Sequence, residues 1–449
     1  MDLNKLHRIH FLGIGGIGMS ALARYFRSKG VIVSGYDRSQ TPLTNELIDE
    51  GIKIHFEDNI DLIPRNIDLV VYTPAIPESN KEYQYFVNNN FELKKRAEVL
   101  GKITQDKFTI AVAGTHGKTT ISSIIAHMLK FADNNVTALI GGICKNYNSN
   151  FITSENTEVF IVEADEYDRS FLTLHPDIEV ISSIDADHLD IYGSKKYLNE
   201  SFKLFTEQIK SNGKLIIKKE IDLTVKAEKI LYYSATCEAD FYSSNIRFED
   251  SKYIFDLNFK NSHIKNINFK IPGKHNIENA VAASAIGIEM GIKKEKIKEA
   301  LETYSGVKRR FDIKIQNPDI IYIDDYAHHP EELKACISSV KELYPDKKIT
   351  GIFQPHLFTR TKDFAAEFAK SLDMLDKVIL LKIYPARELP IEGVSSEMIL
   401  EKIKIKNKKI CSNIEVFEEL KNNKPEVLLT LGAGDIDQLV EPIENILKS

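Results

Sequence analysis

The chain has 449 residues, which is too long for one hydrophobic core and predicts two or three domains. Hydrophobic residues make up 43% and charged residues 28% of it, as in globular proteins that fold in water. The net charge of -6, with no basic block, argues against a nucleic-acid partner, and no apolar run reaches the roughly 18 residues of a membrane span.

The N-terminal residues run directly into a predicted strand, without the layout of a signal peptide. Four cysteines lie far apart and form neither a metal-binding spacing nor a disulfide framework. We expect a cytoplasmic protein without membrane insertion, either a monomer or a homodimer.

A glycine-rich turn follows the first predicted strand. Residues 8–12 read as a strand, 19–28 as a helix and 31–37 as a second strand that ends in Asp37. The turn matches Gly-x-Gly-x-x-Gly, and an acid follows roughly twenty residues later, as in dinucleotide-binding units. The turn predicts binding of NAD, FAD or a UDP-sugar, and the alternative is a turn needed only for close packing. A later strand, 69–72, leads into a loop that begins at Thr73.

A second glycine loop carries the most chemistry. Residues 110–113 read as a buried strand, 121–129 as a helix, and between them lie Gly114, Thr115, His116, Gly117, Lys118, Thr119 and Thr120. Strand, glycine loop and helix is the context of a phosphate-binding loop, whose backbone N–H groups and helix N-terminus face the phosphates. Lys118 would reach the β- and γ-phosphates and the Thr119 hydroxyl would ligate Mg²⁺. The loop is shorter than the common P-loop, and the alternative is an ordinary turn with a solvated lysine.

Acids and histidines follow the next two predicted strands. Strand 159–162 runs into Glu163, and strand 180–184 is followed by Asp187 and His188. We expect the two strands to be neighbours in one sheet, and acids beside a phosphate loop usually meet Mg²⁺. His188 is a metal or phosphate ligand, or a structural histidine.

The rest of the chain indicates an antiparallel patch and then a further α/β unit. Segments 245–248 and 253–259 alternate apolar and polar residues, as half-exposed strands do. An alanine-rich helix follows residues 271–280. Later strands at 320–323, 350–353, 377–381 and 427–431, with a helix at 331–343, indicate a second parallel sheet.

Several motifs in order resemble those of the Mur ligase family, ATP-dependent enzymes that form amide bonds in cell-wall precursors. The resemblance covers essentially the whole chain and rests on these segments: Gly-Ile-Gly-Gly-Ile-Gly-Met-Ser (13–20), Ala-Gly-Thr-His-Gly-Lys-Thr-Thr (113–120), Glu-Ala-Asp-Glu (163–166), Asp-His-Leu-Asp (187–190), Gly-Lys-His-Asn-Ile-Glu-Asn-Ala (273–280), Arg-Arg-Phe-Asp (309–312), Asp-Tyr-Ala-His-His-Pro (325–330) and Gln-Pro-His (354–356).

The resemblance implies an α/β protein of three domains. Residues 1–104 would form a Rossmann-like domain that binds a UDP-sugar. Residues 105–307 would form a central P-loop ATPase-type α/β domain that binds ATP and carries the small antiparallel patch. Residues 308–449 would form a C-terminal Rossmann-like domain that binds an amino acid.

The resemblance also implies the roles of individual residues. The UDP-sugar would lie against Gly15, Gly16, Gly18, Asp37 and Thr73, and the adenine end of ATP against His275 and Asn279. Mg²⁺ would be held by Thr119, Glu163 and His188. Lys118, Arg310 and His328 would be catalytic, with Arg310 reaching the γ-phosphate from the third domain and His328 a candidate base. Asp325, Tyr326 and His328 would line the amino-acid side, and Arg360 would contribute to recognition of a substrate anion.

Two departures and one modification bear on these roles. The family often has Arg after Gln-Pro-His, where this chain has Leu357 with Arg360 nearby, and often a Gly-His pair where this chain reads His55-Phe56-Glu57. Related ligases carry a carbamylated lysine after the Asp-His motif, and Lys203 is the candidate here.

The implied reaction joins L-alanine to the carboxylate of UDP-N-acetylmuramate through an acyl phosphate made from ATP, with Mg²⁺ as cofactor. A close alternative is murein peptide ligase, which joins a recycled tripeptide to the same acceptor. A further alternative is an NAD-dependent oxidoreductase, which leaves the central loop and Glu163 unexplained. A nucleotide-gated binding protein without catalysis is disfavoured by the acids and histidines at so many strand ends.

Overall fold

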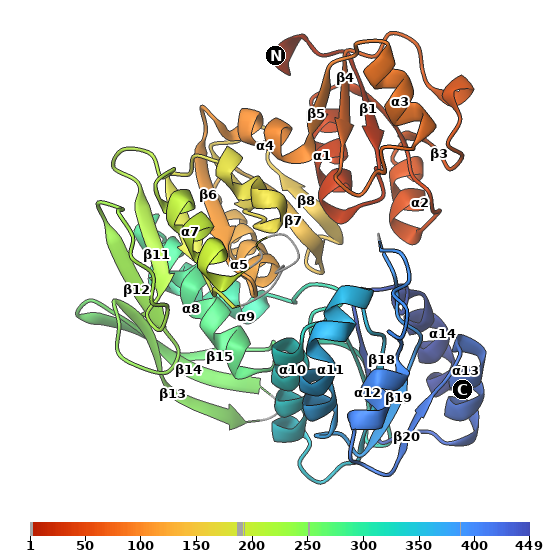
Figure 1. Ribbon diagram of the computed structural model, residues 1–449. Coiled ribbons are helices and arrows are strands. Elements are labelled where there is room, and N and C mark those ends of the chain that lie inside the picture. Colours follow the sequence, from red (N-terminus) through yellow and green to blue (C-terminus); the bar gives the residue numbers. More distant parts are fainter. Residues whose placement is uncertain (1–2, 186–191, 193, 250–251, 387) are drawn as a thin grey trace. The chain divides into compact units, whose positions relative to one another are not determined.

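The computed structural model describes residues 3–185, 192, 194–249, 252–386 and 388–449, and it holds three β-sheets between helices. Contacts divide the chain into two compact units. Unit 1 is residues 1–246, 254–268 and 278–305, and unit 2 is residues 247–253, 269–277 and 306–449. The mixed α/β class expected from the sequence is confirmed (Figure 1).

The first sheet is fully parallel, in the order β3-β2-β1-β4-β5. Its strands are β1 (Arg8–Leu12), β2 (Ile32–Tyr36), β3 (Lys53–His55), β4 (Leu69–Tyr72) and β5 (Leu93–Lys95). The helical segments around it are η1 (Leu3–Lys5), α1 (Ile17–Ser28), α2 (Pro42–Asp49), η2 (Ile60–Leu62), α3 (Lys81–Asn88) and α4 (Arg96–Thr104). Apolar side chains of α1, α2 and α4 pack on one face of the sheet and Phe86 of α3 on the other.

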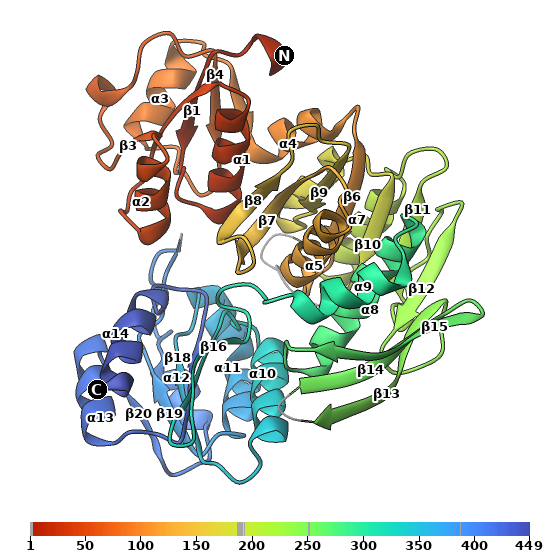
Figure 2. The same ribbon diagram turned by 180° about the vertical axis from the view of Figure 1, so that it is seen from behind.

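The second sheet has ten strands in the order β15-β14-β13-β12-β11-β10-β6-β9-β7-β8. They are β6 (Phe108–Ala113), β7 (Val136–Cys144), β8 (Ser149–Thr153), β9 (Val159–Glu163), β10 (Ile178–Ile181), β11 (Lys214–Lys218), β12 (Ile230–Ser234), β13 (Phe241–Glu249), β14 (Lys252–Phe259) and β15 (Ser262–Phe269). Its helical segments are α5 (Lys118–Phe131), η3 (Tyr167–Thr173), α7 (Lys195–Thr206), α8 (Lys274–Glu289) and α9 (Lys294–Thr303). Figure 2 shows α5, α8 and α9 on one side of this sheet.

Unit 1 is continuous because α1 joins the first two sheets through one apolar core, which contains side chains of both. A polar contact fixes the same junction. The guanidinium of Arg24, which is 6% exposed, donates to Glu50 and Glu46 on α2 and to the side chain of Asn150 on β8. Asn150 in turn donates to the carbonyl oxygen of Ile17 at 2.7 Å.

The third sheet, in unit 2, has the order β16-β17-β21-β18-β19-β20, with only β16 paired antiparallel to its neighbour. Its strands are β16 (Asp312–Gln316), β17 (Ile321–Asp325), β18 (Ile349–Phe353), β19 (Lys377–Leu380), β20 (Lys408–Ile410) and β21 (Val427–Leu431). Its helices are α10 (Pro330–Leu343), α11 (Phe358–Leu372), α12 (Glu397–Lys402), α13 (Asn413–Asn422) and α14 (Asp437–Lys448). Helices α10, α11 and α12 cover one face and α13 and α14 the other.

One sequence expectation about the second sheet is wrong. Strands β9 and β10 are not neighbours, because β6 lies between them. The expected antiparallel patch consists of β13, β14 and β15, and it extends the main sheet through the pairing of β13 with β12. Only Lys260 and Asn261 separate β14 from β15, and a two-residue connection joins strands only in antiparallel orientation.

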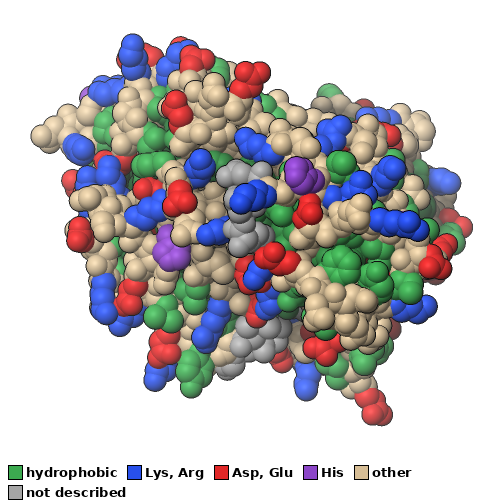
Figure 3. All heavy atoms as spheres, turned by 90° about the horizontal axis from the view of Figure 1, so that it is seen from above, with side chains coloured by type: hydrophobic (Ala, Val, Ile, Leu, Met, Phe, Trp, Pro, Cys, Tyr) green, Lys and Arg blue, Asp and Glu red, His purple; other side chains and the backbone are tan. Residues whose placement is uncertain are grey.

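The surface is of mixed charge. Basic and acidic side chains are interspersed over the face in Figure 3, in keeping with the net charge of -6. Within the part of the chain that the structure describes, no helix has both the length and the apolar character needed to cross a membrane.

One buried carboxyl stands out in the second sheet. Glu179 on β10 is 0% exposed, and neither carboxyl oxygen has a hydrogen-bond partner among the described residues. Side chains alternate along a strand, so Glu179 shares its face with Ile181, which packs in the core with Phe202 of α7. Burial raises the pKa of Glu179 well above its ordinary value, so the folded protein keeps this carboxyl protonated and neutral.

We predict that Glu179 costs stability and that the cost grows with pH. The unfolded chain ionises this group near pH 4.5 while the folded chain keeps its proton, so its contribution becomes less favourable as pH rises through the neutral range. Glu179→Leu should raise the free energy of unfolding at pH 7 by about 1–3 kcal/mol. Urea unfolding of wild type, Glu179→Leu and the isosteric Glu179→Gln at several pH values measures this. A difference between wild type and Glu179→Gln that stays constant from pH 5 to 8 would contradict the neutral-carboxyl account.

Candidate active site

The glycine loop between β6 and α5 is shaped by two residues in the left-handed backbone region. Gly114 has φ 135° and Gly117 has φ 86°, which side chains with a Cβ rarely adopt. A Cβ on Gly114 would also lie 2.2 Å from the hydroxyl of Ser182, and one on Gly117 would lie 2.7 Å from the amide oxygen of Asn279. The loop therefore requires glycine at both positions, and it directs the N-terminus of α5 toward the carboxyl edge of the sheet.

Lys118 is the first residue of α5, and its ammonium group is held by oxygen atoms. Nζ donates to the carbonyl oxygen of Gly114 at 2.6 Å and to the carboxylate of Glu166 at 2.7 Å. Burial alone would lower the pKa of Lys118, but the nearby carboxylates, first of all Glu166, raise it. The lysine is therefore charged, at the position where the charge of a phosphate would be neutralised.

The predicted metal ligands Thr119 and Glu163 lie in contact. The Thr119 hydroxyl donates to a Glu163 carboxylate oxygen at 3.1 Å, and the backbone N–H of Gly141 on β7 donates to the other oxygen. A hydroxyl and a carboxylate are hard oxygen ligands of the kind that Mg²⁺ prefers, so these two residues fit the expected ion. The third predicted ligand, His188, lies outside the described residues.

Serines at the end of β10 support the loop and were missed in the sequence. Ser183 accepts from the backbone N–H of His116 at 2.8 Å and bonds the Thr115 hydroxyl at 2.9 Å. Ser182 donates to the carbonyl oxygen of His116. The sequence signal was available, because the carboxyl ends of adjacent parallel strands meet at one edge and β10 lies beside β6. The imidazole of His116 lies 3.5 Å from Asp185, and Thr120 is buried in the first turn of α5.

The first glycine turn brings together most of the residues predicted to bind the UDP-sugar. The Gly15 N–H donates to the Asp37 carboxylate at 2.7 Å, and a Cβ on Gly13 would lie 2.7 Å from the side chain of Thr73. Gly16 lies in the same turn, as the residue before α1. These residues end β1, β2 and β4, at the carboxyl edge of the first sheet.

A basic residue beside this turn was missed in the sequence. A Cβ on Gly18 would lie 2.7 Å from the guanidinium of Arg96, which begins α4 and pairs with Asp165 at 3.0 Å. The preceding Lys95 pairs with Asp168 at 2.7 Å. The segment between the first two sheets thus contacts both the first glycine turn and the acids that follow β9.

The predicted adenine-side residues both lie on α8. Asn279 lies against Gly117 of the phosphate loop, as the close approach of its amide oxygen shows. His275 is in the first turn of α8 and is exposed. Lys203, the candidate for carbamylation, is partly exposed in the last turn of α7, and its modification stays a prediction.

In unit 2, two consecutive arginines have different surroundings. Arg309 lies 3.3 Å from the buried carboxylate of Asp324 and donates to the carbonyl oxygen of Gly432 at 2.6 Å, which makes it a structural residue of this unit. Both guanidinium groups lie over the ring of Tyr326, that of Arg309 5.3 Å and that of Arg310 4.7 Å from its centroid, so the contacts with Asp324 and Gly432 are what set Arg309 apart. Asp325 accepts from the backbone N–H groups of Phe311 and Ala327, so its carboxylate fixes the loop that carries both Arg310 and Tyr326.

His328 is held by a carboxylate and a carbonyl oxygen. Its Nδ1 lies 3.2 Å from Glu332 and 3.0 Å from the carbonyl oxygen of Tyr326. Both neighbours are acceptors, so Nδ1 carries a proton, and in the neutral imidazole the lone pair is then on Nε2. The rings of Tyr326 and His356 pack against that of His328, at 5.1 and 5.9 Å.

The segment after Gln-Pro-His is buried at Leu357 and Arg360. Arg360 is on the first turn of α11 and only 7% exposed. Leu357, which stands where the family often has Arg, has φ 70° and is also buried. The role expected for Arg360 in binding a substrate anion stays a prediction.

Family models match the chain in three successive segments. The model described as "Mur ligase family, catalytic domain" matches residues 8–108, "Mur ligase middle domain" residues 112–287, and "Mur ligase, glutamate ligase domain" residues 309–436. The domain boundaries predicted at 104 and 307 are not tested by these matches and stay predictions.

Curated relatives and a solved structure match over the full length. The UDP-N-acetylmuramate–L-alanine ligase of Flavobacterium psychrophilum is 51% identical over 100% of this chain and 99% of that protein, and the one of Parabacteroides distasonis is 50% identical over 100% and 98%. The crystal structure of UDP-N-acetylmuramate–alanine ligase from Thermotoga maritima superposes with a TM-score of 0.83 at 27% identity, covering 98% of each chain. With about half of its residues shared with such relatives over its whole length, the chain belongs to the Mur ligase family.

Proposed function

We propose that this protein joins L-alanine to the carboxylate of UDP-N-acetylmuramate with cleavage of ATP to ADP and phosphate, in the synthesis of peptidoglycan precursors. The observation that carries the proposal is the loop at the end of β6, where a charged lysine, a hydroxyl and carboxylates converge on a helix N-terminus. The names of relatives at about 50% identity supply the substrates. We further propose that it acts in the cytoplasm as a monomer or homodimer.

The reaction has to activate a carboxylate, which is a poor acyl donor. Transfer of the γ-phosphoryl group of ATP to the carboxylate gives an acyl phosphate, whose leaving group is then phosphate. Such a transfer depends on neutralising charge and holding the reactants in line. Lys118 would exchange its contact with Glu166 for the phosphate oxygens, and the backbone N–H groups of the loop would bind the same phosphates.

Thr119 and Glu163 would hold Mg²⁺, which when bound neutralises phosphate charge and orients the phosphates. The amine of L-alanine then attacks the acyl phosphate and must lose a proton. His328 suits this task, because Glu332 orients the ring with the lone pair on Nε2. Arg310 would stabilise charge on the transferred phosphoryl group.

We predict that Lys118→Ala abolishes turnover, since it removes charge stabilisation of several kcal/mol from the transferred group. The measurement is release of phosphate from ATP with UDP-N-acetylmuramate and, in turn, L-alanine, L-serine, glycine or the recycled tripeptide. Lys102→Ala is the matched control, because Lys102 is exposed on α4 and its ammonium bonds only Gln105 among the described contacts. Wild type and the control should turn over with L-alanine.

Two results would contradict this proposal in different ways. Near-normal turnover of Lys118→Ala would contradict the assignment of the loop between β6 and α5 as a phosphate-binding loop. Turnover of wild type with the tripeptide but not with L-alanine would keep that assignment and make the protein a murein peptide ligase instead.

The metal assignment gives a second prediction. Glu163→Gln keeps the shape of the side chain but removes its charge, so the Mg²⁺ concentration for half-maximal activity should rise roughly tenfold or more and kcat should fall. His188→Ala should act in the same direction. Mg²⁺ titrations of the ligase reaction measure both, and unchanged titration curves would return the two residues to purely structural roles.

The two neighbouring arginines give a third prediction. Arg310→Ala should lower kcat at least a hundredfold, as loss of a contact to the transferred phosphoryl group does, with nearly unchanged affinity for UDP-N-acetylmuramate. Arg309→Ala should instead lower thermal stability, because it leaves the buried Asp324 without its cation. Steady-state kinetics, calorimetric titration with the sugar nucleotide and thermal melts separate these effects. Wild-type kcat in Arg310→Ala, or loss of sugar-nucleotide binding, would overturn the role of Arg310.

A further inference from the structure

Two histidines and a glutamate converge between the first sheet and helix α3. His10 on β1 and Glu82 on α3 are 0% exposed, and His55 at the end of β3 is mostly buried with a side chain 16% exposed. His10 Nε2 lies 3.3 Å from one Glu82 oxygen and His55 Nε2 lies 2.6 Å from the other. One ligand atom from each residue lies within 4.8 Å of the other two. We name these three residues the His-Glu cluster.

The neighbours of the cluster orient its donor atoms. His10 Nδ1 lies 2.9 Å from the Ser34 hydroxyl, which itself donates to the carbonyl oxygen of Ile9. The tautomer in which His10 Nδ1–H donates to Ser34 leaves the Nε2 lone pair available to a metal ion. In that tautomer the lone pair is directed at the Glu82 oxygen 3.3 Å away, and a divalent ion between the two atoms would bind both.

We propose that the His-Glu cluster is a binding site for a divalent transition-metal ion of the zinc class. Two imidazole nitrogens and one carboxylate are a ligand set for such an ion, with the fourth position open to water. Ligands about 2 Å from a tetrahedral ion lie roughly 3.3 Å apart, the separation found between His10 and Glu82. His55 needs only to exchange its hydrogen bond to Glu82 for the metal. The Ser34 hydroxyl, which bonds His10, and the backbone N–H of Asn59, 3.3 Å from Glu82, would hold these two ligands in position.

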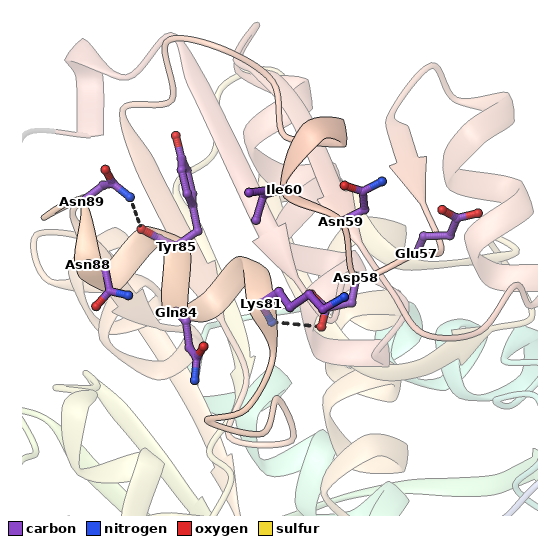
Figure 4. Close-up of a pocket in the computed structure, with 9 residues that line it drawn as sticks. All are labelled: Glu57, Asp58, Asn59, Ile60, Lys81, Gln84, Tyr85, Asn88 and Asn89. Carbon is purple, nitrogen blue, oxygen red and sulfur yellow. Dashed lines mark hydrogen bonds between the residues drawn. The ribbon is translucent and has the colours of Figure 1, made fainter.

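A polar cleft lies beside this cluster. A cavity of about 720 Å³ lies between the segment after β3 and helix α3 and is lined by residues that include Asp58, Asn59 and Lys81 (Figure 4). Asn59 lines the cleft, and its backbone N–H contacts Glu82. Lys81, which also lines the cleft, directly precedes Glu82 in the sequence. The ion would join β1, β3 and the first turn of α3. It is separate from the Mg²⁺ site proposed on Thr119 and Glu163 and does not depend on the proposed reaction.

The test is titration of the full-length, metal-free protein with Zn²⁺ in nucleotide-free buffer, by calorimetry and by elemental analysis after dialysis. Wild type should bind one equivalent with micromolar affinity or tighter and gain several degrees in melting temperature. Co²⁺ should give the visible absorption of a four-coordinate site. His55→Gln and the isosteric Glu82→Gln should each weaken Zn²⁺ binding at least a hundredfold, and Ser34→Ala about tenfold.

His263→Gln is the matched control, because His263 is exposed on β15, and it should bind Zn²⁺ like wild type. Circular dichroism of each variant shows whether it is folded, and Glu82→Gln keeps the test valid should His55→Gln unfold. Absence of Zn²⁺ binding by wild type would overturn the proposal and leave the cluster as a hydrogen-bonded network of side chains. Equal binding by wild type, His55→Gln and Glu82→Gln would overturn it too, by placing the ion elsewhere.

Discussion

The exchange of partners at Lys118 is the interaction on which the proposed chemistry depends. The lysine is partly buried beside carboxylates, so its charge is already compensated by Glu166 before any nucleotide binds. An incoming phosphate has to replace that carboxylate, and it does so with backbone N–H donors and a helix N-terminus already directed at it. The left-handed Gly114 and Gly117 make this geometry possible, and the serines of β10 hold it. The site is therefore prepared for a phosphate rather than formed by it.

Much of the fold followed from local patterns. Strands β1, β4 and β21 begin and end where their apolar runs predict, because a buried parallel strand is a short run bounded by turns. Helices α1 and α5 begin earlier than their apolar spacing indicates, since their first turns hold glycine, lysine and threonine that serve the loop. Strands β7, β8 and β16 were missed. Their sequences carry polar and glycine residues, and their pairing is decided by partners distant in the chain.

Part of the candidate site was also predictable from local sequence patterns. Motifs identified the residues of the loop, and the structure brings Thr119 and Glu163 into contact as expected. The sequence could not show that Glu166 pairs with Lys118, that Arg96 lies on Gly18, or that Arg309 and Arg310 differ in role. Those facts depend on which strand ends are adjacent and on contacts far apart in the chain. The His-Glu cluster is of this kind, because its members come from three separate elements of the first domain.

The most direct test of the central claim is a crystal structure of the protein with a non-hydrolysable ATP analogue and Mg²⁺. The account predicts phosphates against the backbone N–H groups of residues 115–119, Lys118 Nζ bonded to phosphate oxygens instead of Glu166, and the metal ion on Thr119 and Glu163. A nucleotide bound elsewhere, with Lys118 still paired to Glu166, would contradict it.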